Sequence, residues 1–264
     1  LASQLSKYLS PQVYKSIFSG KKNVIIEAYR KKLTVFFSDI KGFTEITDRL
    51  EPEVLSSLLN SYLNEMSQIA LKYGGTIDKF VGDAILIFFG DPETKGEKED
   101  AKACALMALE MRERMKYLRK IWEDQGISNP LEIRIGINTG FCNVGNFGSE
   151  DRLDYTIIGG EVNLASRLES NADPGQILIS HETYSLIKKD IVCEKKEELS
   201  VKGISHNIQT YQISDTSKNL EKKKLLLNEE YEGFNLNIDL NVAYKDQVIS
   251  SLESTLSKMK KSRT

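Results

Sequence analysis

The sequence predicts an α+β fold in which helices pack on a mixed sheet. Apolar runs of strand length alternate along the chain with segments in which apolar residues recur every three or four positions, as in amphipathic helices. Tight hairpins join some neighbouring strands, which favours a mixed α+β sandwich over a doubly wound parallel sheet. No apolar run approaches the roughly 20 residues that a membrane-spanning helix requires.

The first 32 residues predict a helical lead-in. Ser10 and Pro11 suit the N-cap and first turn of a helix, and Gly20 suits its end. A basic stretch at 30–32 precedes the first strongly apolar strand. We therefore expect a linker or transducer segment at 1–32 and a domain boundary near residue 32.

The region 33–214 contains the alternating elements. Gly74 and Gly75 are suited to end the first long helix. Met107, Met111 and Met115 lie in the apolar stripe of the second, so we assign them to core packing and not to ligand binding. In chain order we expect a strand at 33–38, a helix at 52–73, strands at 76–80 and 84–89, a helix at 97–124, strands at 131–139 and 142–147, a helix at 160–171, a strand at 176–179, a helix at 181–188, and strands at 191–199 and 208–213.

The composition changes after Ser214. Residues 215–224 are polar and rich in lysine, which is typical of a linker. Apolar and polar residues alternate at 234–240 as in a strand, and the apolar residues at 248–259 have helical spacing. We expect a C-terminal tail at 215–264, with a strand and an amphipathic helix but no residues that carry chemistry.

The overall charge argues against general nucleic-acid binding. The 264 residues include 36 Lys+Arg and 38 Asp+Glu, for a formal net charge of -2, whereas contacts to many phosphates require a basic face. Three Cys without C-x-x-C spacing and only two His cannot assemble a zinc site. We expect a reduced, cytoplasmic chain. Because it begins at Leu1 and not at Met, we also expect it to be part of a longer protein.

Asp39 is the first candidate for chemistry. It ends the apolar strand that contains Phe36 and Phe37, and a turn at Gly42 follows. A carboxylate beside a flexible turn can bind a hard cation that itself holds phosphate oxygens. A helix-capping Asp has the same pattern, and the residues alone do not choose between the two.

Asp83 is the second candidate. Gly82 and Asp83 stand between two apolar strands, as in an ordinary hairpin turn. If that hairpin pairs beside the first strand, Asp83 comes close to Asp39. Two adjacent carboxylates require cations between them, which is the arrangement of two-metal phosphoryl-transfer sites with ions about 3.5–4 Å apart.

Asn163 and Arg167 form the third candidate. They stand four residues apart on a predicted helix, so an amide and a guanidinium can point at the same anion. The alternative is a solvated polar face.

Together these segments resemble the class III nucleotidyl cyclases, the family of bacterial and animal adenylate and guanylate cyclases. The matching motifs are F-x-D-I-x-G-F-T, D-K-F-x-G-D-A, R-I-G-I-N-T-G and Y-T-I-I-G-x-x-V-N-L-A-S-R-L-E, in family order over about residues 30–214. The resemblance implies a ferredoxin-like βαββαβ core with extensions, akin to polymerase palm domains. It also implies that Asp39, Asp83 and the backbone carbonyl of Ile40 hold two Mg²⁺ or Mn²⁺ ions.

The resemblance further implies which residues bind the substrate. Lys79 stands where adenylate cyclases place a lysine that binds adenine and guanylate cyclases place glutamate. Thr156 is at the second base-reading position, where many bacterial adenylate cyclases have Thr and guanylate cyclases usually have Cys. Both residues favour ATP.

The remaining positions concern the ribose and phosphates. By the same resemblance, Asn163 orients the ribose and Arg167 stabilises charge on the α-phosphate in the transition state. Lys202 matches a lysine that binds the triphosphate, and Arg152 is a further candidate phosphate contact.

The implied protein is an adenylate cyclase that makes cyclic AMP and pyrophosphate. The family works as a head-to-tail homodimer, with metal and lysine residues of one chain facing Asn163, Arg167 and Thr156 of the other. Residues 1–32 resemble the segment that joins cyclase domains to upstream sensory or membrane domains. The alternatives are a guanylate cyclase, and a catalytically silent module that only dimerises or binds nucleotide.

Overall fold

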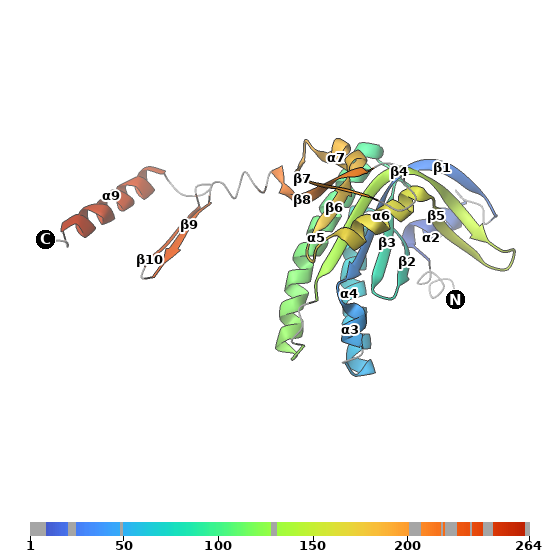
Figure 1. Cartoon of the computed structure of the whole chain (residues 1–264), viewed down its shortest axis with the longest axis horizontal. Helices are drawn as coiled ribbons and strands as arrows, with labels where there is room; N and C mark the ends of the chain where they lie inside the picture. Colours follow the sequence, from blue (N-terminus) through green and yellow to red (C-terminus); the bar gives the residue numbers. More distant parts are fainter. Residues whose placement is uncertain are drawn as a thin grey trace. The chain divides into compact units, whose positions relative to one another are not determined.

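An eight-stranded mixed sheet organises the chain from Ala28 to Thr216 (Figure 1). Its strands lie in the order β2-β3-β1-β4-β6-β8-β7, and β5 pairs with β4. They are β1 (Ala28–Ile40), β2 (Thr76–Val81), β3 (Ala84–Phe89), β4 (Ile133–Gly148), β5 (Leu153–Ile158), β6 (Ile177–Ser180), β7 (Ile191–Leu199) and β8 (Ile208–Thr216). The computed structural model describes residues 9–20, 25–47, 50–127, 131–200, 207–217, 219, 226–232, 234–239 and 245–261.

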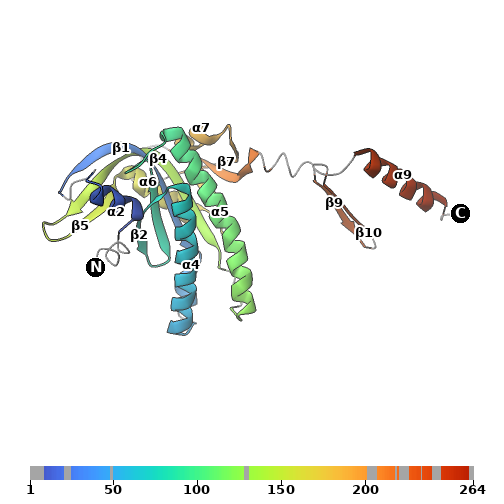
Figure 2. The same cartoon turned by 180° about the vertical axis from the view of Figure 1, so that it is seen from behind.

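Helices cover both faces of this sheet. The helix α6 lies on one face, seen from the front in Figure 1, and α4 and α5 lie on the other, seen from the front in Figure 2. The helices of this region are α2 (Pro11–Phe18), α3 (Phe43–Thr47), α4 (Pro52–Tyr73), α5 (Glu97–Asp124), α6 (Gly160–Asn171) and α7 (His181–Ile187). The bounds of α4, α5 and α6 agree with the approximate bounds predicted from the sequence.

The half of the sheet from its edge strand β2 to β4 confirms the predicted ferredoxin-like core. Apart from the short α3 between β1 and α4, the elements β1, α4, β2, β3, α5 and β4 follow one another as βαββαβ. Their strands lie in the order β2-β3-β1-β4, and each neighbouring pair is antiparallel. This topology places the turn between β2 and β3 at the carboxyl end of β1.

The observed strands depart from the predicted ones in three main ways. The first strand begins at Ala28, five residues before the expected start, because residues 28–32 pair with 141–145 of β4. The predicted break at 140–141 is absent, and β4 runs continuously through Gly140. A Cβ at that position would lie 2.6 Å from the Glu161 side chain, so this glycine allows close packing and not a turn. The strand β5 had no prediction.

Two layers of apolar side chains hold these elements together. On the α4 and α5 face, a large buried cluster includes Phe36 of β1, Met66 of α4 and Met107 of α5. All three α5 methionines assigned to the core are buried. On the other face, Val162 and Ala165 of α6 pack in a smaller cluster. Successive residues of β1 therefore alternate between two cores, as the period of a strand requires.

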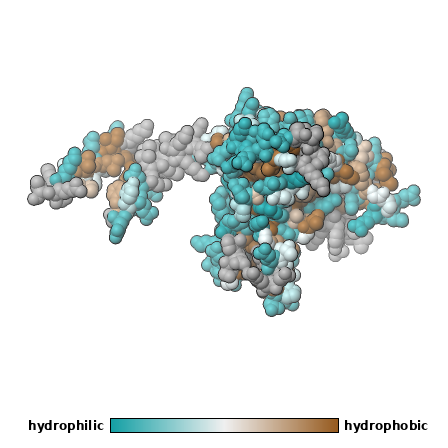
Figure 3. All heavy atoms as spheres, in the orientation of Figure 1, coloured by the Kyte–Doolittle hydropathy of each residue, from teal (hydrophilic) through white to brown (hydrophobic). Residues whose placement is uncertain are grey.

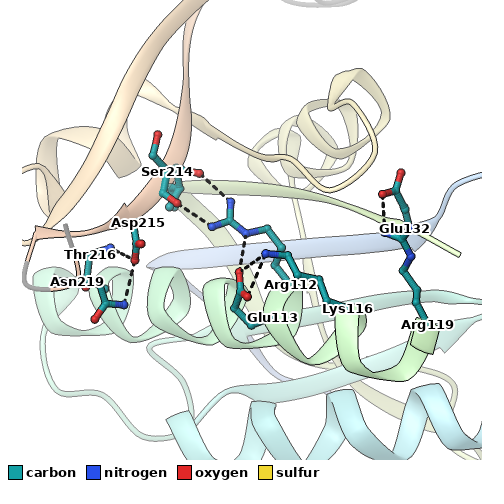
Figure 4. A network of polar contacts seen from close by, with 10 residues as sticks. Arg112, Glu113, Lys116, Arg119, Glu132, Ser214, Asp215, Thr216 and Asn219 are labelled. Atoms are coloured by element: carbon teal, nitrogen blue, oxygen red, sulfur yellow. Dashed lines mark hydrogen bonds and ion pairs between the residues drawn. The ribbon is translucent and has the colours of Figure 1, made fainter. Parts of the chain in front are cut away.

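Arg112 of α5 holds the end of β8. Its guanidinium donates to the carbonyl oxygens of Ile213, at 3.2 Å, and Ser214, at 2.7 Å (Figure 4). Further along α5, Arg119 donates to Glu132 at 2.8 Å. The Arg112 contacts join β8 to α5, and the Arg119 contact joins α5 to the residue just before β4.

The chain divides into two compact units, Leu1–Ser214 and Asp215–Thr264. The second contains the hairpin of β9 (Leu226–Tyr231) and β10 (Phe234–Asp239), and the helix α9 (Lys245–Lys261). The expected strand and helix are both present, and β9 is additional. Exposed hydrophobic residues gather on α9 (Figure 3), namely Ile249, Leu252, Leu256 and Met259. Among the described residues, none of the helices has the length and apolar character of a membrane span.

Candidate functional site

The hairpin of β2 and β3 brings Asp83 to the end of β1. The strand β3 pairs antiparallel with β1, so the turn that contains Gly82 and Asp83 lies beside Asp39 and Ile40. The backbone N–H of Ile40 donates to Asp83 Oδ2 at 2.7 Å. The sequence argument that this hairpin would bring the two aspartates together therefore holds.

Arg134 occupies the space beside Asp39. Its Nε and Nη2 lie 3.0 Å and 2.6 Å from the two carboxylate oxygens of Asp39, in the forked geometry of a charge-assisted pair. Its Nη2 is also 3.0 Å from Glu169 Oε1, and its Nη1 donates to the Ser170 carbonyl at 3.1 Å. Arg134 is not among the residues predicted from the sequence, although it opens the R-I-G-I-N-T-G motif. The pairing register places it directly opposite Asp39.

Close packing at Gly136 brings Glu169 to the same place. A Cβ on Gly136 would lie 2.2 Å from the backbone nitrogen of Glu169, so only glycine lets α6 cross β4 this closely. The Glu169 residue is 6% exposed. Burial, and then its hydrogen bond to Asp39, raise the pKa of Glu169 to about 8. Glu169 is likewise not among the residues predicted from the sequence, and its only signal there is its place at the end of the N-L-A-S-R-L-E motif.

The chemistry of this cluster fits divalent cations. Burial raises the pKa of Asp83, and the nearby charge of Asp39 adds to the effect, while the hydrogen bond from Ile40 opposes it. Within the described residues, no three His, Cys, Asp or Glu side chains are grouped to form a complete metal site. Two carboxylates and a strand-end carbonyl are hard oxygen ligands, which Mg²⁺ and Mn²⁺ prefer when phosphates and water supply the rest.

Lys79 and Thr156 meet through Asp78. The Thr156 hydroxyl donates to Asp78 Oδ2 at 2.6 Å, and Lys79 Nζ lies 3.3 Å from Asp78 Oδ1. All three residues belong to one chain. The expected division, in which the lysines of one chain face Thr156 of the other, is therefore wrong for Lys79. The reason is that β5 folds back along β4 and its Thr156 reaches β2.

The other predicted residues have separate positions. Asn163 is exposed and Arg167 half-buried on α6, where their spacing of four places them on one face. Arg152 and Lys79 line the same cleft, of about 250 Å³, beside α2. Lys202 lies outside the described residues.

Comparison with known proteins agrees with this fold. The adenylate and guanylate cyclase catalytic domain family matches residues 26–215. The crystal structure of the adenylyl cyclase CyaB from P. aeruginosa has a TM-score of 0.71 and 65% identity, and the match covers 72% of this chain and 97% of that chain. The guanylyl cyclase Cya2 has a TM-score of 0.70 and 33% identity, over 73% of this chain and 96% of that one.

Curated relatives are much longer than this chain. A terminal-differentiation specific adenylate cyclase of Dictyostelium discoideum is 33% identical over 234 residues, which are 86% of this chain and 11% of that protein. The matched residues 26–215 include the ferredoxin-like core, Asp39, Asp83, and Asp78 with its partners Lys79 and Thr156. The chain thus belongs to the family of adenylate and guanylate cyclase catalytic domains.

Proposed function

We propose that this chain is an adenylate cyclase domain that converts ATP to 3′,5′-cyclic AMP and pyrophosphate. One observation carries the choice of ATP: Lys79 and Thr156 both contact the buried carboxylate of Asp78. This contact holds a cationic donor and a hydroxyl next to each other. The 65% identity to an adenylyl cyclase supports it. In the reaction the ribose 3′-oxygen attacks the α-phosphorus, the bond to the β-phosphate oxygen breaks, and pyrophosphate leaves.

Asp39, Asp83 and the Ile40 carbonyl would hold two Mg²⁺ or Mn²⁺ ions. When bound, such ions lower the pKa of the attacking hydroxyl and offset phosphate charge. Arg134 then no longer has to neutralise Asp39, and its guanidinium becomes available to the anionic triphosphate. Arg167 stabilises the negative charge that develops on the α-phosphate, and Asn163 orients the ribose.

The proposed active unit is a head-to-tail homodimer with two composite sites. Asp39 and Asp83 of one chain would face Lys79, Thr156 and Arg167 of the other, with Lys79 and Thr156 on the same side because they meet within one chain. Lys202 and Arg152 are proposed to contact the triphosphate. Since the curated relatives are longer, we also propose that a sensory or membrane domain precedes this chain in the full protein.

The experiment is an assay of purified chain with Mn²⁺ and either ATP or GTP, measuring cyclic AMP and cyclic GMP. Cyclic AMP as the main product supports the proposal. Preferential cyclic GMP formation would instead indicate a guanylate cyclase, and no product from a folded dimer would indicate a silent module. The double variant Lys79→Glu with Thr156→Cys should lower cyclic AMP output and raise the GTP/ATP activity ratio.

A further inference from the structure

Asp78 is a buried carboxylate that lies between the two proposed base-reading residues. Its side chain is 1% exposed. Its Oδ2 accepts from the Thr156 hydroxyl at 2.6 Å and from the Ile157 backbone N–H at 3.2 Å, and its Oδ1 lies 3.3 Å from Lys79 Nζ. Three donors therefore converge on one carboxylate.

These contacts fix the direction of each hydrogen bond. An ionised carboxylate only accepts, so the single hydroxyl proton of Thr156 is committed to Asp78. The Thr156 oxygen then has only lone pairs left for a ligand. Burial raises the pKa of Asp78, but Thr156, Lys79 and Ile157 each oppose that shift by favouring the charged form.

We propose that Asp78 is a positioning residue that sets base specificity, by holding the Thr156 hydroxyl as an acceptor and the Lys79 ammonium as a donor. This inference rests on the proposed function. Adenine presents an amino donor at its 6-position and an acceptor at N1, which complement that pair. Guanine presents a carbonyl acceptor and an N–H donor at the same places. Its carbonyl would face the Thr156 acceptor, and its N–H would face the Lys79 donor.

The inference explains why a threonine can discriminate between the two bases. A hydroxyl that rotates freely can donate as well as accept, so alone it would accommodate the guanine carbonyl. Because the Thr156 hydroxyl donates its proton in a hydrogen bond to Asp78, turning it toward a ligand costs a hydrogen bond to a buried charge. Asp78 thereby restricts the Thr156 hydroxyl, which could otherwise donate or accept, to accepting a hydrogen bond from the base.

The test compares kcat/KM for ATP and GTP, with Mn²⁺, in full-chain variants. Asp78→Ala should lower the ATP/GTP ratio roughly tenfold, the equivalent of one hydrogen bond. The matched control is Asp100→Ala, because Asp100 is also buried and accepts from a threonine hydroxyl, at 2.5 Å, and a backbone N–H, at 3.0 Å, outside the site. That control should leave the ratio unchanged.

Two further variants keep the test decisive. Asp78→Asn retains the size of the side chain and an oxygen for Ile157, but one amide oxygen cannot serve all three donors. It should fold even if the alanine variant does not, and its ratio should also fall. In a Thr156→Val background, Asp78→Ala should change the ratio less than in wild type, because its effect through the hydroxyl is already lost.

The outcomes separate this inference from the proposed function. If wild type makes cyclic AMP but both Asp78 variants lower ATP and GTP turnover equally, Asp78 is only structural and the inference is overturned while the proposed function stands. If Asp78→Ala changes the ATP/GTP ratio of kcat/KM equally in wild type and in the Thr156→Val background, the inference is likewise overturned. If wild type makes no cyclic nucleotide, both are overturned.

Discussion

Arg134 and Asp39 stand opposite each other on β4 and β1 and form a forked ion pair, with contacts of 2.6 and 3.0 Å. The pair lies where we propose that divalent cations bind. A guanidinium therefore supplies the positive charge that Asp39 needs when no cation is bound. Its removal should affect the protein differently with and without metal.

We expect Arg134→Ala to lower the free energy of unfolding by about 2 kcal/mol without divalent cations, because two carboxyl groups lose their cation in a largely buried place. Adding Mn²⁺ should reduce this loss. Urea unfolding with and without Mn²⁺ measures both effects. Arg119→Ala is the control, since it breaks a more exposed pair with Glu132 and should cost at most about 1 kcal/mol. Equal losses in the two variants would contradict the prediction.

Glu169 should make stability depend on pH in the absence of metal. Its pKa rises from 4.5 to about 8 in the folded chain, so between these values the folded state holds a proton that the unfolded state has lost. Its contribution is fully present below pH 4.5 and is lost as pH rises towards 8. Glu169→Gln should remove this decline and be more stable than wild type at high pH. Denaturant midpoints across this range test it, and parallel curves for the two proteins would refute it.

Asp83→Asn should separate folding from metal binding. An amide oxygen can still accept from the Ile40 N–H, and the substitution removes a buried charge beside Asp39, so the variant should be at least as stable as wild type. Its Mn²⁺-dependent activity should nevertheless fall at least a hundredfold, an estimate of about 3 kcal/mol in transition-state free energy. Asp83→Ala, which leaves the N–H without its acceptor, should also be less stable. Near-normal activity of Asp83→Asn would remove it from the metal site.

Mixing two inactive variants tests the composite site. Asp39→Asn and Arg167→Ala should each disable both sites of a homodimer. A heterodimer of the two carries one doubly altered site and one intact site, so random pairing should restore roughly a quarter of wild-type activity. Co-expression avoids slow chain exchange. Demonstrated heterodimers without recovery would place the site within one chain.

Truncations should locate the true start of the catalytic fold. We expect removal of 1–32 to cost about 2 kcal/mol or more beyond removal of 1–27, because residues 28–32 pair with β4 and each ladder hydrogen bond contributes about 1 kcal/mol. Ending the chain after Thr216, where β8 ends, should leave turnover largely intact. Free energies of unfolding and cyclic AMP rates measure the two effects. Equal stability of the two N-terminal truncations would place the start of the fold after residue 32.

The sequence by itself determined the helices and the order of the motifs. Apolar spacing and end signals placed α4 and α5 close to their observed bounds, because helix periodicity and end signals are local. The hairpin around Gly82 was equally local. The motifs then indicated the family and the candidate residues without any knowledge of contacts.

Only the tertiary structure decided which side chains meet. Arg134 faces Asp39 across 95 positions, and Thr156 reaches Asp78 across 78. Such pairs depend on strand register, and a shift of one residue would turn each side chain to the other face. The predicted break at 140–141 has a related cause, because no local pattern shows that α6 packs against a continuous β4 at Gly140. The candidate site residues could thus be predicted from the sequence, whereas the side chains that they contact are determined by the packing of distant strands.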